Sequence, residues 1–287
     1  MSRVTSTIVV FVGALALSLF TRANAQPRAA APTPPPVPRA AAPIDLTGYW
    51  VSIVTQDWRW RMVTPANGDY PRLPLTPEAR DLASAWDPAK DEAAGEQCRS
   101  YGAPALMSVP GRLHITWQDD RTLKVEVDAG MQTRTLSFSD DNAPADATAR
   151  DGGSAANAGA TLRRPRTWQG VSVAQWQTPR ANVPLLLRPA ERTADAPAVT
   201  PSGGSLRVVT TNLRAGYLRK NGVPYSENAV LTEHWDVYKR ANGEEYLTIT
   251  TQVDDPQYLR TPRLVAPVFK KEPNGAKWDP TPCSAQW

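Results

Sequence analysis

Two charged residues lie among apolar side chains in segments that alternate like β-strands. Glu233 stands between Leu231 and Trp235, and Arg134 precedes Leu136 with the same spacing. A carboxylate in apolar surroundings has a raised pKa and can act as a general base, and a guanidinium can stabilise an oxyanion. A close arginine would instead lower the pKa of Glu233. The pair is therefore a candidate for proton-transfer catalysis, for ligand contacts or for a structural ion pair.

The surroundings of this pair favour a binding site for a small hydrophobic or amphipathic molecule. Few polar groups are needed to orient a ligand in an apolar pocket. We expect walls from Trp117, Leu123, Val125, Trp235 and Val237. We expect polar contacts from Gln132, Arg134, Asn212 and Glu233. A loop at residues 216–225 would form the mouth, where an Asn-Gly turn brings together Tyr217, Arg219, Lys220 and Tyr225.

The opposite parity of the same strands carries a rival set of polar side chains, namely His114, Glu126, His234 and Asp236. If that face lined the interior, these imidazoles and carboxylates could bind a divalent metal or do acid–base work. Their spacing matches no known metal motif, and a solvated outer surface is the simpler explanation. We therefore predict no metal site and no cofactor.

Apolar or β-branched alternation broken by Gly, Asp and Asn turns predicts a mainly β fold. The candidate strands are residues 49–54, 113–118, 122–128, 131–138, 170–176, 206–213, 229–238 and 246–253. Eight antiparallel strands in meander order can close into a barrel that removes both sheet edges. A two-sheet sandwich is the alternative, because strand number does not distinguish the two architectures.

The tight turns fix which side chains share a face. With a turn at residues 119–121, Trp117 lies opposite Leu123 and Ile115 lies opposite Val125. This face is apolar and should point inward. The next turn sets Arg134 beside Val125, which predicts a guanidinium inside the barrel. An unpaired buried charge costs several kcal/mol, so Arg134 should meet Glu233 or a polar ligand.

Two helices are expected to interrupt the connection after the first strand. Thr76 followed by Pro77 is a good N-cap and first-turn pair. Asp87 followed by Pro88 ends that helix and begins a second one, which carries Cys98 on its apolar stripe.

The chain has two cysteines, Cys98 and Cys283. In an oxidising compartment, two cysteines without neighbouring metal ligands favour one disulfide, and free thiols are the alternative. The disulfide would tie the C-terminal tail to the second helix.

The N-terminus has the pattern of a secretory signal peptide at residues 1–25, with Arg3, an apolar run and Ala-Asn-Ala. The apolar run is shorter than the roughly 20 residues that cross a bilayer, which disfavours a membrane anchor. We expect an Ala/Pro-rich tether at 26–44, one domain at 45–287 and loop insertions near 140–165 and 178–204. The protein would be periplasmic or secreted, without a membrane span.

The charge pattern disfavours nucleic acid as a partner. The formal net charge is +4, and two of these charges, Arg3 and Arg22, lie in the predicted signal peptide. The remaining cations are scattered among carboxylates, whereas a surface that follows phosphates needs clustered positive charge.

The first predicted strand opens with Gly48-Tyr49-Trp50, a Gly-x-Trp pattern that resembles the start of lipocalin-like (calycin) barrels. The resemblance implies that Trp50 packs at the closed end of the barrel. Lipocalins mostly bind small hydrophobic molecules, and some relatives are hydratases, isomerases or lyases. The helical pair, the insertions and Thr210-Thr211-Asn212 in place of Thr-Asp-Tyr depart from the pattern. Residues 109–120, 216–227 and 269–283 are similar to those of secreted bacterial proteins of unassigned function.

Three functions follow from these features. The leading hypothesis is an exported protein that binds a small hydrophobic or amphipathic molecule in the barrel. The second is a cofactor-independent lyase, hydratase or isomerase that uses Glu233 as base and Arg134 as oxyanion partner. The third is an envelope interaction protein with a filled barrel. No phosphate loop, Rossmann fingerprint, Gly-x-Ser-x-Gly elbow or zinc-protease helix is present, which disfavours those chemistries.

Overall fold

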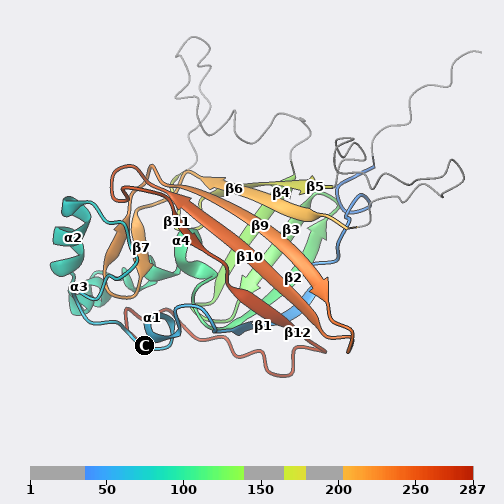
Figure 1. Ribbon diagram of the computed structural model, residues 1–287, viewed down its shortest axis with the longest axis horizontal. Helices are drawn as coiled ribbons and strands as arrows, with labels where there is room; N and C mark the ends of the chain where they lie inside the picture. The colour runs from blue at the N-terminus through green and yellow to red at the C-terminus, as the bar shows by residue number, and fades with distance from the viewer. Residues whose placement is uncertain (1–35, 139–164, 179–202, 287) are drawn as a thin grey trace, which may run out of the picture. The chain divides into compact units, whose positions relative to one another are not determined.

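A closed β-barrel dominates the structure. The computed structural model describes residues 36–138, 165–178 and 203–286. The predicted signal peptide, the tether up to residue 35 and nearly all of both predicted insertions lie outside these residues. The barrel consists of β1 (Gly48–Ile53), β2 (Arg112–Asp119), β3 (Thr122–Val127), β4 (Gln132–Phe138), β5 (Val171–Gln177), β6 (Ser205–Thr211), β9 (Val230–Lys239), β10 (Glu245–Asp254) and β12 (Val268–Glu272). Pairing of β9 with β10 closes the ring (Figure 1).

The barrel therefore has nine strands in its ring, not the eight predicted. Each predicted strand overlaps an observed one, and the additional strand is β12, which pairs with both β1 and β10. The short β11 (Arg263–Val265) continues alongside the far half of β10. The strand at β12 escapes sequence analysis because Val268 and Phe269 are followed by two lysines, which breaks the alternation.

One pair of strands departs from the predicted antiparallel meander, because β4 and β5 run parallel. Parallel neighbours need a crossover connection of about a dozen residues or more. The chain between Phe138 and Val171 is long enough to provide it. The prediction of a purely antiparallel barrel is thus wrong at this one position.

The predicted register is confirmed across the first hairpins. Trp117 pairs with Leu123 and Ile115 with Val125, and Val125 in turn pairs with Arg134. Ile115 and Val125 have no exposed surface. The apolar rows therefore point inward and carry Arg134 with them.

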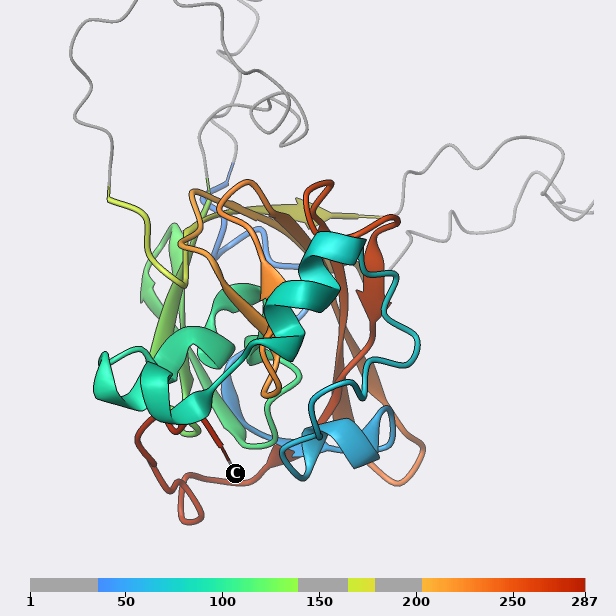
Figure 2. The same cartoon turned by 90° about the vertical axis from the view of Figure 1, so that its left-hand side faces the viewer.

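Short helices lie between β1 and β2: α1 (Trp58–Arg61), α2 (Pro77–Ser84), α3 (Pro88–Ala93), η1 (Gln97–Tyr101) and α4 (Ala103–Leu106). Thr76 Oγ1 accepts a hydrogen bond from Ala79 N at 3.3 Å, which caps α2. A hairpin of β7 (Gly216–Arg219) and β8 (Val223–Tyr225) contacts α2 and η1. Figure 2 shows these elements over one end of the barrel, which we call the helical end.

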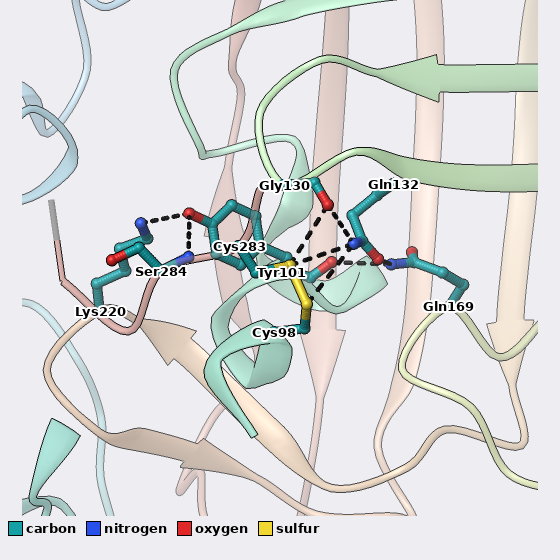
Figure 3. Close-up of a disulfide and its surroundings, with 8 residues drawn as sticks. All are labelled: Cys98, Tyr101, Gly130, Gln132, Gln169, Lys220, Cys283 and Ser284. Carbon is teal, nitrogen blue, oxygen red and sulfur yellow. Dashed lines mark hydrogen bonds between the residues drawn. A yellow bond between two sulfur atoms is a disulfide. The ribbon is translucent and has the colours of Figure 1, made fainter. Parts of the chain in front are cut away.

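A disulfide joins Cys98 to Cys283, as predicted, with their Cα atoms 5.1 Å apart (Figure 3). The predicted second helix is shorter than expected. It ends at Ala93, Gly95 follows with a φ of 70°, and Cys98 belongs to the separate 3-10 helix η1. The C-terminal tail is therefore tied to η1. A disulfide is typical of proteins outside the cytoplasm.

Ordered packing begins before Asp45, where sequence analysis places the start of folding. Trp176 donates its indole N–H to the Pro38 carbonyl at 2.8 Å, and Ile44 packs against the barrel core. Among the described residues, none of the helices combines the length and the apolar character that crossing a bilayer requires.

Candidate functional site

The predicted Arg134–Glu233 pair forms inside the barrel. Arg134 Nη2 donates to Glu233 Oε2 at 2.7 Å and Nη1 donates to Oε1 at 3.1 Å, and both side chains are fully buried. Arg134 Nη2 also lies 3.2 Å from Thr210 Oγ1, which in turn lies 2.8 Å from Ser172 Oγ. The two parallel hydrogen bonds pair the opposite charges, and Arg134 Nε has no partner among the described residues. The arrangement is that of an internal ion pair.

Side chains fill the barrel around this pair. A side chain with no accessible surface borders no space large enough for a water molecule. The side chains inside the barrel that have no accessible surface are Trp50, Ile115, Leu123, Val125, Leu136, Leu206, Val208, Trp235, Leu247 and Ile249. Val237 packs against the same core and is partly buried. A ligand in this region would have to push these side chains apart.

The other residues predicted for the site do not gather around the pair. Trp235 shares the inward face of β9 with Glu233. Trp117 stacks on Phe138, with ring centroids 5.7 Å apart, and lines a separate hollow beside residues 39–47. Gln132 donates to the Gly130 carbonyl at 2.6 Å, next to the disulfide (Figure 3). Asn212 donates to the Pro165 carbonyl at 3.3 Å, after the end of β6.

Tyr217 and Tyr225, the two tyrosines predicted to line the barrel mouth, pack within the helical end. Tyr217 donates to Asp91 Oδ1 at 3.3 Å and lies under the guanidinium of Arg99, and burial raises its pKa. Tyr225 is fully buried, with its hydroxyl close to Gly102 and Gly216. Neither tyrosine lines the hollows described below.

The rival polar set lies on the outer face of the barrel. His114 stacks on Tyr49 with ring centroids 4.1 Å apart, and its Nδ1 lies 3.2 Å from Glu126 Oε2. His234 and Asp236 alternate with inward-facing Glu233 and Trp235 on β9. Within the described ranges, no three His, Cys, Asp or Glu side chains converge as metal ligands do.

A cleft at the helical end concentrates buried positive charge instead. Two adjoining hollows, with volumes of about 30 and 240 Å³, share the lining residues Gln56, Asp57, Arg219, Arg263 and Val265. Arg61 and Lys220 line the smaller hollow, which we call the inner hollow. Arg72 lines the larger hollow, which we call the outer hollow. We call this the arginine cleft.

Three different segments supply the buried arginines. Arg61 ends α1, Arg219 ends β7 and Arg263 begins β11, and their exposed fractions are 8, 8 and 6%. Local structure accounts for two of these positions. Arg61 closes a one-turn helix that begins after Asp57, whose backbone is in the left-handed conformation. Arg263 faces inward opposite Val253 on β10.

The hydrogen bonds of these guanidiniums are incomplete. Arg61 Nε donates to the Ser108 carbonyl at 2.6 Å, yet its Nη2 has no partner among the described residues. Arg219 Nη1 lies 3.5 Å from the Pro71 carbonyl. Buried Arg263 Nη1 has no hydrogen-bond partner in the described part of the chain. No described carboxylate forms an ion pair with Arg263.

Among the described residues, one carboxylate lines the cleft. Asp57 Oδ2 lies 3.8 Å from Arg219 Nη2, and Asp57 Oδ1 lies 3.6 Å from Arg72 Nη1. Burial lowers the pKa of Arg263 to about 10, with the positive charges of Arg219 and Arg61 acting in the same direction and Asp57 opposing them. Burial likewise lowers the pKa of Arg61 to about 10. The guanidiniums remain charged at neutral pH, so the cleft carries a net positive charge.

This arrangement can bind an anion. Guanidiniums offer several N–H donors in a fixed plane, which suits a carboxylate or a phosphate. The indole N–H of Trp60 also lines the inner hollow and has no partner among the described residues. Apolar side chains such as Leu218 and Val265 complete the walls and would accept the uncharged part of a ligand.

Sequence analysis named two of these cations, Arg219 and Lys220, as part of the mouth loop, and missed Arg61 and Arg263. The run Trp58-Arg59-Trp60-Arg61 was an available signal, because alternating indoles and guanidiniums are unusual in a short turn. Arg263 stands in a segment without any such pattern. Comparison of the chain with protein-family models, curated proteins and solved structures finds no match.

Proposed function

We propose that the protein binds a small anionic or amphipathic molecule in the arginine cleft. The observation that carries the proposal is the guanidinium of Arg263, which is 6% exposed, lines both hollows and lacks an ion-pair partner among the described residues. A buried charge without a partner is strongly destabilising, and a perturbed ionisable group in a cleft is a candidate for a functional site. An anion at Arg263 would also contact Arg219 or Arg61.

The proposal keeps the amphipathic ligand expected from the sequence and moves it from the barrel interior to the mouth. A hydrophobic ligand inside the barrel, or proton transfer by Glu233, would require the Arg134–Glu233 pair and the side chains packed around it to separate. A lipocalin-like ancestry is part of the same proposal. It is supported by the closed barrel and by Trp50, which is fully buried and donates to the Leu46 carbonyl at 2.9 Å.

We place this binding outside the cytoplasm, in the periplasm or the secreted fraction. The Cys98–Cys283 disulfide supports this location because the cytoplasm keeps thiols reduced.

Thermal unfolding with inorganic phosphate, citrate or glycolate, each compared with sodium chloride at the same ionic strength, tests the proposal. We expect at least one of these anions to raise the midpoint, since a ligand that binds only the native state stabilises it. Calorimetric titration should then show one site. Arg263→Met should weaken binding about tenfold or more, the value of a charge-assisted hydrogen bond.

Arg260→Met is the matched control. Arg260 is exposed, lies three positions before Arg263 and does not line the cleft. The proposal is wrong if no anion acts beyond chloride, or if both variants lower the affinity equally.

A further inference from the structure

Lys220 is a buried amine at the inner end of the arginine cleft. It follows β7 directly, lines the inner hollow together with Arg219, and is 4% exposed. Its Nζ donates to Tyr101 Oη at 2.6 Å and lies 4.5 Å from the centroid of the same ring (Figure 3).

The disulfide helps to hold this amine in place. Tyr101 Oη also accepts a hydrogen bond from Ser284 N at 3.3 Å, and Ser284 is the neighbour of Cys283. Tyr101 itself lies in η1 with Cys98. Figure 3 shows Lys220, Tyr101 and the disulfide in one connected group, so Nζ is anchored between two cross-linked segments.

Burial shifts the amine toward its neutral form. Burial lowers the pKa of Lys220 to about 8, so a substantial fraction of Nζ carries a lone pair at mildly alkaline pH. A lysine in this condition is a nucleophile toward carbonyl groups. Arg219 and Arg61 line the same hollow and would hold the negative charge of a ligand close to Nζ.

We propose that Lys220 forms a reversible imine with a small 2-oxo acid or anionic aldehyde whose charge is held by the cleft arginines. This inference rests on the proposed anion binding and names the ligand class. The Nζ lone pair attacks the carbonyl carbon, and a proton passes from nitrogen to the former carbonyl oxygen to give a carbinolamine. The carbon–oxygen bond then breaks, the carbon–nitrogen double bond forms, and the second amine proton leaves in the released water.

The size of the site favours a small ligand. The inner hollow has a volume of only about 30 Å³ and adjoins the outer one of about 240 Å³, with which it shares five lining residues. Glyoxylate is a suitable probe because its carboxylate and aldehyde are adjacent. Glycolate has the same carboxylate without the carbonyl group, and acetaldehyde has the carbonyl group without the charge.

The test is reductive trapping of the wild-type protein with glyoxylate and cyanoborohydride, followed by peptide mass spectrometry. We expect the adduct to accumulate at Lys220 at least about tenfold faster than at exposed Lys277, because Lys220 combines an amine of lowered pKa with the proposed anion site. Arg263→Met should slow labelling of Lys220 by glyoxylate but not by acetaldehyde. Lys220→Met should lose the adduct and still bind glycolate, whereas Lys277→Met should keep it.

The outcomes separate the two proposals. If glycolate binds in the cleft but glyoxylate labels lysines without preference for Lys220, the imine is excluded and anion binding stands. If glycolate, phosphate and citrate all fail to bind the wild-type protein, the proposed function and the imine fall together. The labelled lysine is identified in the wild-type protein, so the test of the imine does not depend on whether a variant folds.

Discussion

The barrel interior and the arginine cleft both bury guanidinium groups, but they treat the charge in opposite ways. Arg134 meets Glu233 through two short hydrogen bonds, and neither side chain has exposed surface. Arg263 has no ion-pair partner among the described residues and leaves Nη1 without a hydrogen bond. The charge of Arg134 is neutralised by Glu233, although Arg134 Nε has no described hydrogen-bond partner, whereas the charge of Arg263 has no described counter-charge.

We interpret this difference as one between a buried arginine that stabilises the fold and a buried arginine that belongs to the proposed binding site. Arg134 and Arg263 are both buried, so burial alone does not identify a site. A buried charge that the chain neutralises itself contributes to a unique fold, and a buried charge left unpaired lowers stability in the free protein. The two regions should therefore respond to mutation with opposite signs.

The largest expected effect is in the barrel interior. Glu233→Gln leaves Arg134 buried without its counter-charge and should lower the free energy of unfolding by about 3 to 5 kcal/mol. Urea unfolding measures the change. Glu227→Gln, in an exposed pair with Arg166, is the control and should change stability by less than about 1 kcal/mol. A small loss at Glu233 would mean that water reaches the pair.

Removing the unpaired charge of the cleft should have the opposite sign. Arg263→Met is expected to raise the free energy of unfolding of the ligand-free protein by about 1 to 3 kcal/mol, because a buried charge is replaced by an apolar group of similar length. The same variant should bind anions about tenfold more weakly or worse. If Arg263→Met is instead destabilised as strongly as Glu233→Gln, Arg263 has a structural partner and the contrast between the two regions is wrong.

The helical end should also contribute a pH dependence of stability. The pKa of Lys220 is about 8 in the folded protein, below its ordinary value of 10.5. Between these values the unfolded chain binds the proton and the folded chain does not, so stability should rise with pH, by at most about 1.4 kcal/mol per pH unit. Below pH 8 both states are protonated and Lys220 adds no slope.

Urea unfolding at several pH values between 7 and 10 measures this effect as the difference between the wild-type protein and Lys220→Met. Equal slopes for the two proteins would show that the amine keeps its ordinary pKa.

The smallest expected effect concerns the one carboxylate of the cleft. Asp57→Asn keeps the size of the side chain, and asparagine also tolerates the left-handed backbone at this position, where φ is 52°. Loss of the negative charge should strengthen anion binding about twofold to fivefold, a value typical of one partly solvated charge. Asp120→Asn, at an exposed turn, should leave the affinity unchanged. Weaker binding by Asp57→Asn would place the ligand away from Asp57.

Much of the barrel follows from the sequence. Alternation with tight turns locates the overlapping predicted strands and sets Arg134 beside Val125, and two cysteines in a chain with a leader pattern predict the disulfide. The strands and their register depend on residues that are close in the sequence. The disulfide could be predicted because two cysteines allow one pairing. The contact of Arg134 with Glu233 is also anticipated, because two opposite charges forced into one apolar interior have few other partners.

The tertiary structure alone decides the rest. Strand β12 lacks an alternating pattern and forms by pairing with β1 and β10. The parallel pairing of β4 with β5 needs a long crossover connection. The arginine cleft brings together Arg61, Arg219 and Arg263, which are far apart in the chain and follow no shared pattern. Local sequence determines which face of a strand is apolar, whereas the closing of the barrel determines which distant charges meet and which of them is left without a partner.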